Sequence, residues 1–173
     1  MREPPADLVT LCREEHPRLV RALRLQTGDA SRAEDLAQEA LVRLWQRWRT
    51  VRRLDHPAAW LHRVAINLAI DDHRRRAAER RAIVRLPAPV AMTPADDAPD
   101  DVRAALLRLP ERQRAAVVLR YLLDLSVADV AAALDLSENA TRQLTHRAVE
   151  ALRADSDVVA VPAPDLEASP YAH

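Results

Sequence analysis

Basic side chains gather in one stretch of the chain, where they could bind nucleic acid. Residues 47–81 hold ten arginines against four acidic residues, although the chain as a whole is neutral. Five of these arginines, Arg74, Arg75, Arg76, Arg80 and Arg81, fall within eight residues. Each exposed arginine at a helix C-terminus stabilises the helix by about 0.3–1 kcal/mol through the helix dipole. Five arginines are more than this stabilisation of a helix end requires. The stretch therefore indicates phosphate binding, with a steep salt dependence.

A second polar set, near the C-terminal end, has the residue types that read base edges. Arginine pairs well with guanine, and asparagine and glutamine pair well with adenine. The set lies on one predicted helix and comprises Glu138, Asn139, Arg142, Gln143 and His146. A solvated face on a helix that binds another protein is the alternative interpretation.

The three tryptophans lie close to a basic segment, residues 49–56, that breaks the helical pattern and is predicted to be a loop. Trp45 and Trp48 precede this loop and Trp60 follows it. Aromatic and arginine side chains around a loop are suited to holding an unstacked base. For Trp45 and Trp60, a place in the hydrophobic core is an equally good interpretation.

No residue pattern indicates an enzyme or a metal site. The six histidines are scattered, and we expect His62 and His146 to lie at the surface or to support other polar side chains rather than to bind a ligand. With one glycine there is no glycine-rich phosphate loop, and with one cysteine, Cys12, there is no disulfide or cysteine metal site; we expect Cys12 to be buried or half-buried. We expect no cofactor. Without a run of 18 apolar residues or a signal peptide, the chain is expected to be cytoplasmic, with no membrane insertion.

The elements that position these residues are predicted to be helices throughout. Leu8, Leu11, Leu19 and Leu23 are spaced for one face of a helix over 6–27, which Pro17 should end, kink or restart. Gly28 is expected at a helix end with positive φ.

Two further helices complete the predicted bundle. Ser31 and Glu34 are expected to form a capping box at the start of the next helix, with Asp29 as another possible cap. Pro57 should begin a third helix that continues into the arginines. Residues 6–81 are therefore predicted to form a small helical bundle.

A second helical module is predicted after a linker. Residues 82–100 are rich in proline, alanine and aspartate and read as a flexible linker, whereas 155–173 read as a disordered acidic tail. Within 101–154, Pro110 should begin a helix, and Ser126 and Ser137 should cap two helices joined by a short turn. That pair predicts a helix-turn-helix motif. The fold class is therefore all-α, with two small domains.

The sequences of several segments resemble those of the extracytoplasmic-function group of sigma factors, which belong to the sigma-70 family. The stretch AEDLAQEALVRLW (33–45) resembles the core helix of region 2, and PAAWLHRVAINLAID (57–71) resembles its promoter-reading helix. In the second module, LLRLPERQR (106–114), VLRY (118–121) and residues 126–148 resemble region 4. These motifs occur in the family's order over about residues 7–154.

The resemblance implies a sigma factor, which binds core RNA polymerase through the β′ clamp and β flap and reads two promoter elements. Family members also commonly bind an anti-sigma factor. The clamp would face four residues of the first motif: Asp35, Gln38, Glu39 and Arg43. The −10 element would contact the loop and the third helix, at Arg49, Arg52, Arg53, Trp60, Arg63, Asn67, Asp71, Arg74 and Arg75. The −35 element would contact the last helix, at Ser137, Glu138, Asn139, Arg142, Gln143, His146 and Arg147.

The second module departs from the family pattern at three residues. Asp135 stands where the family usually has glycine, and Thr141 and Thr145 stand where it usually has aliphatic residues. Either the last helix is rotated to bury Leu144 instead, or the module is less stable than usual.

Two other functions remain open at this point. A helix-turn-helix regulator acting without polymerase would explain only 101–154. A sigma-like adaptor that binds only protein is compatible with the near balance of eight arginines and seven acidic residues over 101–154.

Overall fold

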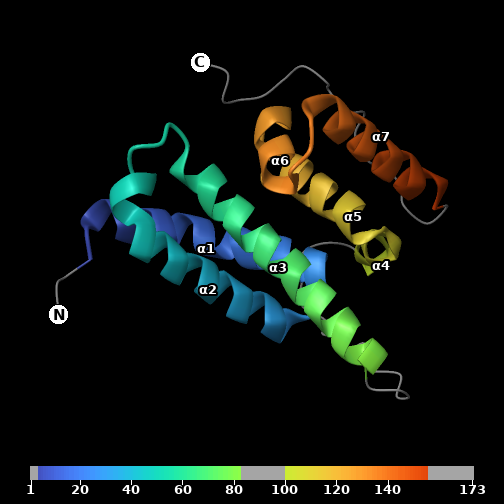
Figure 1. Ribbon diagram of the computed structural model, residues 1–173, viewed down its shortest axis with the longest axis horizontal. Coiled ribbons are helices and arrows are strands. Elements are labelled where there is room, and N and C mark those ends of the chain that lie inside the picture. The colour runs from blue at the N-terminus through green and yellow to red at the C-terminus, as the bar shows by residue number, and fades with distance from the viewer. Residues whose placement is uncertain (1–3, 83–99, 156–173) are drawn as a thin grey trace.

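The computed structural model describes residues 4–82 and 100–155, and these ranges contain helices and no strands (Figure 1). This confirms the predicted all-α class. The expected linker (82–100) and tail (155–173) lie outside the described residues, except at their ends. The helices are α1 (Ala6–Thr27), α2 (Ala30–Val51), α3 (Pro57–Ala82), α4 (Asp100–Arg108), α5 (Glu111–Val117), η1 (Val118–Leu122), α6 (Val127–Leu134) and α7 (Glu138–Ala154).

The N-terminal module is a bundle of α1, α2 and α3, which pack against one another along their lengths (Figure 1). Each helix contributes apolar residues at helical spacing, so that they fall on one side of the helix. Leu23 of α1, Leu36 and Leu44 of α2 and Leu61 of α3 are completely or almost completely buried. Their burial is the main source of stability of this module.

The corner between α1 and α2 is built from one glycine and one aspartate. Gly28 has a φ of 74° and donates its backbone N–H to the carbonyl of Arg24, as predicted for a helix end. The side chain of Asp29 then accepts the backbone N–H of Arg32 at 3.0 Å. The predicted capping box at Ser31 is wrong, because α2 begins at Ala30, two residues earlier than a cap at Ser31 would place it. Glu34 instead pairs with Arg24 at 3.4 Å.

Helix α1 runs continuously through Pro17, so this proline neither ends the helix nor restarts it. Proline removes one backbone hydrogen bond from a helix interior, which costs about 3 kcal/mol. Here the apolar residues on both sides, Leu8 before and Leu19, Val20 and Leu23 after, are buried in the same core. Burial of this shared face therefore outweighs the local cost.

Helix α2 also extends further than its sequence indicated. The predicted loop of 49–56 begins only after Val51, so Arg49 lies in the last turn of the helix. Trp48 and Val51 are 7% and 2% exposed, and their burial keeps this turn helical. The connection to α3 is consequently a turn over residues 52–56.

The C-terminal module contains the predicted helix-turn-helix motif in α6 and α7. The side chain of Ser126 accepts the backbone N–H of Asp129, and that of Ser137 accepts the backbone N–H of Ala140. Asp135 ends α6 with a φ of 53°, the conformation that glycine usually provides. Sequence reasoning missed η1, a single π-helical turn closed by a hydrogen bond from the N–H of Leu123 to the carbonyl of Val118.

The two modules lie against each other in this structure (Figure 1). Helix α4 contacts α1, and α5, η1 and α6 contact α3. Among residues 4–82 and 100–155, no helix combines the length and the apolar character needed to cross a membrane.

The α1–α2 corner gives a direct test of the observed cap. Replacing Asp29 with alanine should lower the free energy of unfolding by about 1 kcal/mol, because the first turn of α2 loses a hydrogen bond to its free N–H groups. The matched change Ser31→Ala should alter it by less than about 0.5 kcal/mol. Urea titrations followed by circular dichroism measure both. Equal losses for the two variants would contradict this cap.

Candidate nucleic-acid and protein interfaces

One side of α2 carries exposed polar residues beside exposed apolar ones. The four residues that the sequence assigned to a protein partner, Asp35, Gln38, Glu39 and Arg43, are all exposed. Arg43 donates a hydrogen bond to Glu39 at 2.6 Å. Val42 and Trp45 lie among them and are 49% and 57% exposed. We call these six residues the α2 face.

The exposure of Trp45 is the feature of the α2 face that sequence reasoning left undecided. Gln38, Val42 and Trp45 are spaced by four and three residues, so they share one side of the helix. A large aromatic side chain left in solvent beside charged residues is typical of a surface that becomes buried against another protein. The core interpretation is wrong for Trp45 and right for Trp48.

The turn after α2 and the first turns of α3 surround a hollow of about 230 Å³. Trp60 and Arg63 of α3 line it and are both half-buried. Arg52 pairs with Asp7 of α1 at 3.4 Å, and Arg53 is exposed. The residues that line the hollow are Leu54, His56, Ala59, Trp60, Arg63 and Asp129. An aromatic ring and a guanidinium group at one opening provide what stacking of a single base requires.

Five of the residues assigned to α3 share one side of that helix. Their spacing of three, four, four and three residues keeps them in line along α3. Asn67 is half-buried, whereas Asp71 and Arg74 are exposed and lie 3.9 Å apart. We call this set the α3 face: Trp60, Arg63, Asn67, Asp71 and Arg74.

Asp72, which sequence reasoning did not single out, organises the arginines around this face. Its side chain is only 6% exposed and accepts a two-point hydrogen bond from Arg32 of α2. Arg75 and Arg76 lie 3.1 and 3.2 Å from the same carboxylate. Arg75, predicted to contact DNA, is therefore also part of an internal network. The Arg32–Asp72 pair joins the first turn of α2 to the middle of α3.

The pKa of Asp72 reflects this network. Burial by itself would raise the pKa of the carboxyl group, but the hydrogen bonds from Arg32 and Arg75 outweigh it, so the pKa lies below its usual value. Asp72 thus remains ionised at neutral pH and keeps three guanidinium groups in place.

The outer side of α7 presents all seven residues predicted to contact DNA. We call this set the α7 face, and all of its members are exposed: Ser137, Glu138, Asn139, Arg142, Gln143, His146 and Arg147. Arg142 pairs with Glu138 at 2.9 Å, and His146 pairs with Glu150 at 3.3 Å. Ser137 is occupied as the helix cap.

The two unusual threonines of α7 keep the helix in its expected orientation. Thr141 is 1% exposed and Leu144 is half-buried, so the helix is not rotated to bury Leu144 in place of Thr141. The hydroxyl of Thr141 donates to the carbonyl of Ser137, and that of Thr145 donates to the carbonyl of Thr141. Each hydroxyl is therefore satisfied within the helix.

His62 was expected to lie at the surface or to support another polar side chain, and the structure shows the second of these. It is 2% exposed, and its Nε2 lies 2.8 Å from a carboxylate oxygen of Glu15 in α1. This hydrogen bond lowers the pKa of Glu15. Cys12 is half-buried as expected, and burial raises the pKa of its thiol. His62 acts as a link between α1 and α3.

Within residues 4–82 and 100–155, no group of three or more histidine, cysteine, aspartate or glutamate side chains is arranged to hold a metal ion.

Two family models match the chain, one on each module. Residues 11–79 match the model described as sigma-70 region 2, and residues 100–152 match the model described as sigma-70, region 4. The first match contains the α2 and α3 faces, and the second contains the α7 face.

Relatives of known function cover most of the chain. The ECF RNA polymerase sigma factor SigL of Mycobacterium tuberculosis is 39% identical in an alignment of 142 residues, which covers 76% of this chain and 78% of that protein. The RNA polymerase sigma-E factor of Streptomyces coelicolor is 36% identical in an alignment of 141 residues, which covers 78% of this chain and 77% of that protein.

Solved structures show the same architecture. The sigma factor RpoE of Bartonella quintana, crystallised with the anti-sigma factor NepR, superposes with a TM-score of 0.73 at 24% identity, over 88% of this chain and 95% of that one. The extracytoplasmic function sigma factor SigJ of Mycobacterium tuberculosis gives 0.58 at 35% identity, over 81% of this chain and 52% of that one.

The Asp72 network predicts a pH-dependent contribution to stability. Replacing Asp72 with asparagine should lower the free energy of unfolding at pH 7 by about 1.5–3 kcal/mol, because buried hydrogen bonds to charged groups are lost. Asp71→Asn, on the exposed neighbour, should change it by less than about 0.5 kcal/mol.

The lowered pKa of Asp72 determines how its contribution to the free energy of unfolding changes with pH. The stabilisation is complete above the unfolded pKa of about 3.9 and is lost as the pH falls through the folded pKa. The difference between the wild-type chain and Asp72→Asn should therefore shrink below about pH 4. Denaturant titrations between pH 7 and pH 3 measure it, and a difference that grows on acidification would contradict the assignment.

Proposed function

This chain belongs to the extracytoplasmic-function group of the sigma-70 family, and on that premise we propose that it binds core RNA polymerase and directs it to promoters. The observation that carries the proposal is the presence of both matched regions in family order, region 2 over 11–79 and region 4 over 100–152. A regulator acting without polymerase would account for the second match and leave the first without a role. Sigma factors are not a class of catalytic enzymes. Because the proposed function requires RNA polymerase and promoter DNA, we expect the chain to act in the cytoplasm.

The α2 face is proposed to bind the β′ clamp of polymerase. Its exposed charges can set the orientation of a partner, and burial of Val42 and Trp45 can supply most of the affinity. The Asp72–Arg32 pair supports this role, because it fixes the start of α2 relative to the promoter-reading helix. We assign the contact with the β flap to the C-terminal module.

The α3 face and the turn before it are proposed to bind the −10 element after its strands separate. Opening DNA costs a few kcal/mol for each unstacked base, least at flexible T·A-rich steps. The hollow beside Trp60 and Arg63 can hold an unstacked base and recover part of that cost. Exposed arginines nearby, including Arg49, Arg52, Arg53 and Arg74, can hold the strand by its phosphates.

The α7 face is proposed to read the −35 element in the major groove. All of its side chains are exposed, and Arg142 and Gln143 are of the residue types that pair with guanine and adenine. The Glu138 carboxylate orients Arg142 before binding. An anti-sigma factor that covers these faces is a further expected partner.

Changes on the α2 face should weaken assembly with polymerase. Replacing Val42 and Trp45 together with alanine should reduce the affinity for core polymerase by at least about 30-fold, because a buried aromatic anchor is worth about 2 kcal/mol or more. Asp35→Ala combined with Gln38→Ala should weaken it too, without changing promoter preference. Fluorescence anisotropy of the labelled chain with core polymerase measures each affinity. Val9→Ala, which trims an apolar residue of similar exposure on α1, is the control.

Unchanged affinity in the Val42 and Trp45 variant, or an equal loss in the Val9 control, would contradict a polymerase-binding role for the α2 face.

A change on the α7 face should act through one promoter element only. Arg142→Ala should lower run-off transcription by about 10- to 100-fold on templates with an intact −35 element, because one base contact is worth about 1–3 kcal/mol. On a template whose −35 element is scrambled, the variant and the wild-type chain should transcribe equally. A loss of the same size on both templates would contradict a base-reading role for Arg142.

A further inference from the structure

Arginines from three helices line one cavity of about 260 Å³, where the α1–α2 corner meets α3 and the start of the C-terminal module. They are Arg32 of α2, Arg76 and Arg80 of α3, and Arg114 of α5. We call this space the Arg114 cavity. The carboxylates of Asp29 and Asp72 also line it, so four arginines against two acids give the lining a net charge of +2 with His73 neutral. A concave site lined by one sign of charge attracts ions of the opposite sign.

Arg114 is buried in this lining although its Nε makes no hydrogen bond. The residue is only 7% exposed, and its Nε has no hydrogen-bond partner among residues 4–82 and 100–155. Burial lowers the pKa of its guanidinium group, and the carboxylate of Glu111 offsets this only in part. A buried charge is costly unless it is paired and hydrogen-bonded. The burial of Arg114 is therefore best explained by an anion that binds against it.

Gln26 adds a buried hydrogen-bond acceptor to the same lining. Its Nε2 donates to the backbone carbonyl of Glu111 at 3.4 Å, and because a carbonyl can only accept, this bond fixes which end of the amide is the oxygen. The residue is 3% exposed, and its Oε1 has no hydrogen-bond partner within the described part of the chain. Buried polar groups are nearly always satisfied. A ligand of this cavity should therefore donate one hydrogen bond as well as carry negative charge.

The two carboxylates of the lining are already held by other groups of the protein. Asp29 accepts the backbone N–H of Arg32, and Asp72 pairs with the side chains of Arg32 and Arg76. Arg80 is exposed, so its guanidinium group can approach an anion without losing a buried contact. Guanidinium groups bind phosphate oxygens through two parallel hydrogen bonds. An anion in the cavity can therefore pair with Arg114 and Arg80 while the Asp72 network stays intact.

The size and charge of the Arg114 cavity favour a small dianion. Its volume of about 260 Å³ is below the roughly 300–1,000 Å³ of pockets that hold drug-sized ligands, so it suits a small ion rather than a whole nucleotide. The backbone phosphates of DNA do not suit it either, because a side chain that is 7% exposed lies out of their reach. The net charge of +2 matches an ion with two negative charges.

The hydrogen phosphate ion meets each of these requirements. As a dianion it has three oxygens that accept hydrogen bonds from guanidinium groups and one O–H group that can donate to the Oε1 of Gln26. Sulfate has the same shape and charge but no O–H group at neutral pH. A phosphate monoester, whose second pKa is about 6, has also lost this proton at neutral pH.

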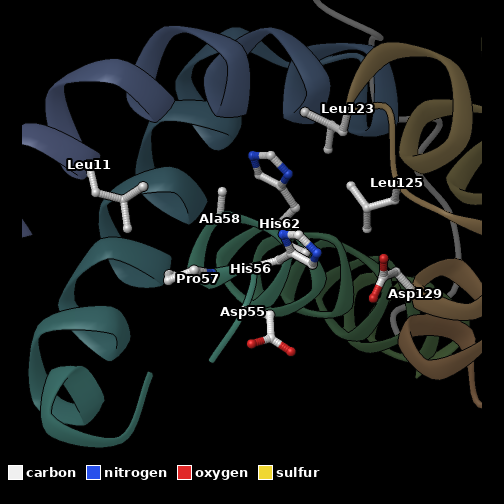
Figure 2. A pocket seen from close by; sticks show the side chains of 10 residues that line it. Leu11, Asp55, His56, Pro57, Ala58, His62, Leu123, Leu125 and Asp129 are labelled. Carbon is white, nitrogen blue, oxygen red and sulfur yellow. The ribbon is translucent and has the colours of Figure 1, made fainter. Parts of the chain in front are cut away.

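A neighbouring cavity has the opposite electrostatic character. Figure 2 shows this cavity, of about 170 Å³, with Leu11, Leu123 and Leu125 among its lining residues. The carboxylates of Asp55 and Asp129 line it too. Because carboxylates repel phosphate, we expect an anion to bind in the Arg114 cavity and not in this one.

We propose that the Arg114 cavity binds inorganic phosphate as the hydrogen phosphate ion. The guanidinium groups of Arg114 and Arg80 hold its charged oxygens, and the Oε1 of Gln26 accepts its O–H group. None of the lining residues belongs to the α2, α3 or α7 face. The site therefore goes beyond the proposed sigma function, and binding requires neither polymerase nor DNA.

Calorimetric titration of the whole 173-residue chain with sodium phosphate, at an ionic strength held constant with sodium chloride, tests the proposal. Saturable binding should be at least about tenfold tighter for phosphate than for sulfate, a difference of about 1.4 kcal/mol. Arg114→Met should weaken phosphate binding by at least about tenfold, because it removes the buried charge from the cavity. Arg21→Gln, which removes one exposed charge from α1, is the matched control and should bind phosphate as the wild-type chain does.

Two further variants test the site if Arg114→Met does not fold. Arg80→Gln alters an exposed residue and should also weaken phosphate binding. Gln26→Met should abolish the preference for phosphate over sulfate, because it removes the acceptor of the O–H group. Circular dichroism checks that each variant keeps its helices. In nitrogen-15 NMR spectra of the wild-type chain, phosphate should shift the Nε–H signal of Arg114 and leave that of Arg21 unchanged.

The absence of saturable phosphate binding to the wild-type chain would overturn the proposal. Equal affinities for phosphate and sulfate, or unchanged phosphate binding by a folded Arg114→Met chain, would overturn it as well. A single-stranded oligonucleotide without terminal phosphates separates this site from DNA binding, because its affinity should be the same for the wild-type and Arg114→Met chains. An equal loss of affinity for the oligonucleotide and for phosphate would assign these arginines to the DNA backbone, against the proposal.

Discussion

Helix α3 is buried on two of its sides and carries the α3 face on the third, and the rest of the structure depends on this constraint. One side, with Leu61, Ala65 and Ala69, is buried in the bundle. A second side, with His62, Ile66 and Ile70, is also buried, and α3 contacts α1, α2, α5, η1 and α6. Only the third side remains for the α3 face. A helix so confined cannot rotate to present other residues, so the side chains of the α3 face are fixed by packing.

The Asp72 network connects this helix to α2, which carries the proposed polymerase-binding face. A buried carboxylate is costly unless it is paired, and here guanidinium groups from α2 and α3 share it. The same contact that stabilises the bundle therefore sets the position of α2 relative to α3. In the proposed function, this geometry sets the position of the −10 element relative to polymerase.

Several local features were predictable from the sequence, although the start and end of α2 were not, and long-range features were not predictable. The caps at Ser126 and Ser137 and the positive φ of Gly28 and Asp135 depend on neighbours within a few residues. The continuity of α1 through Pro17, by contrast, depends on burial of leucines against other helices. The His62–Glu15 and Asp72–Arg32 pairs join residues 47 and 40 positions apart, beyond the reach of any periodic pattern. The docking of the two modules likewise could not be predicted from the local spacing of residues.

The central claim is that this chain gives polymerase its promoter specificity. The most direct test is in vitro transcription of a library of genomic fragments by core RNA polymerase with and without the chain, with transcript starts mapped by sequencing. We predict starts that appear only with the chain, each at a fixed distance downstream of one shared pair of elements. Duplex DNA binding without polymerase, combined with no new transcript start, would contradict the claim.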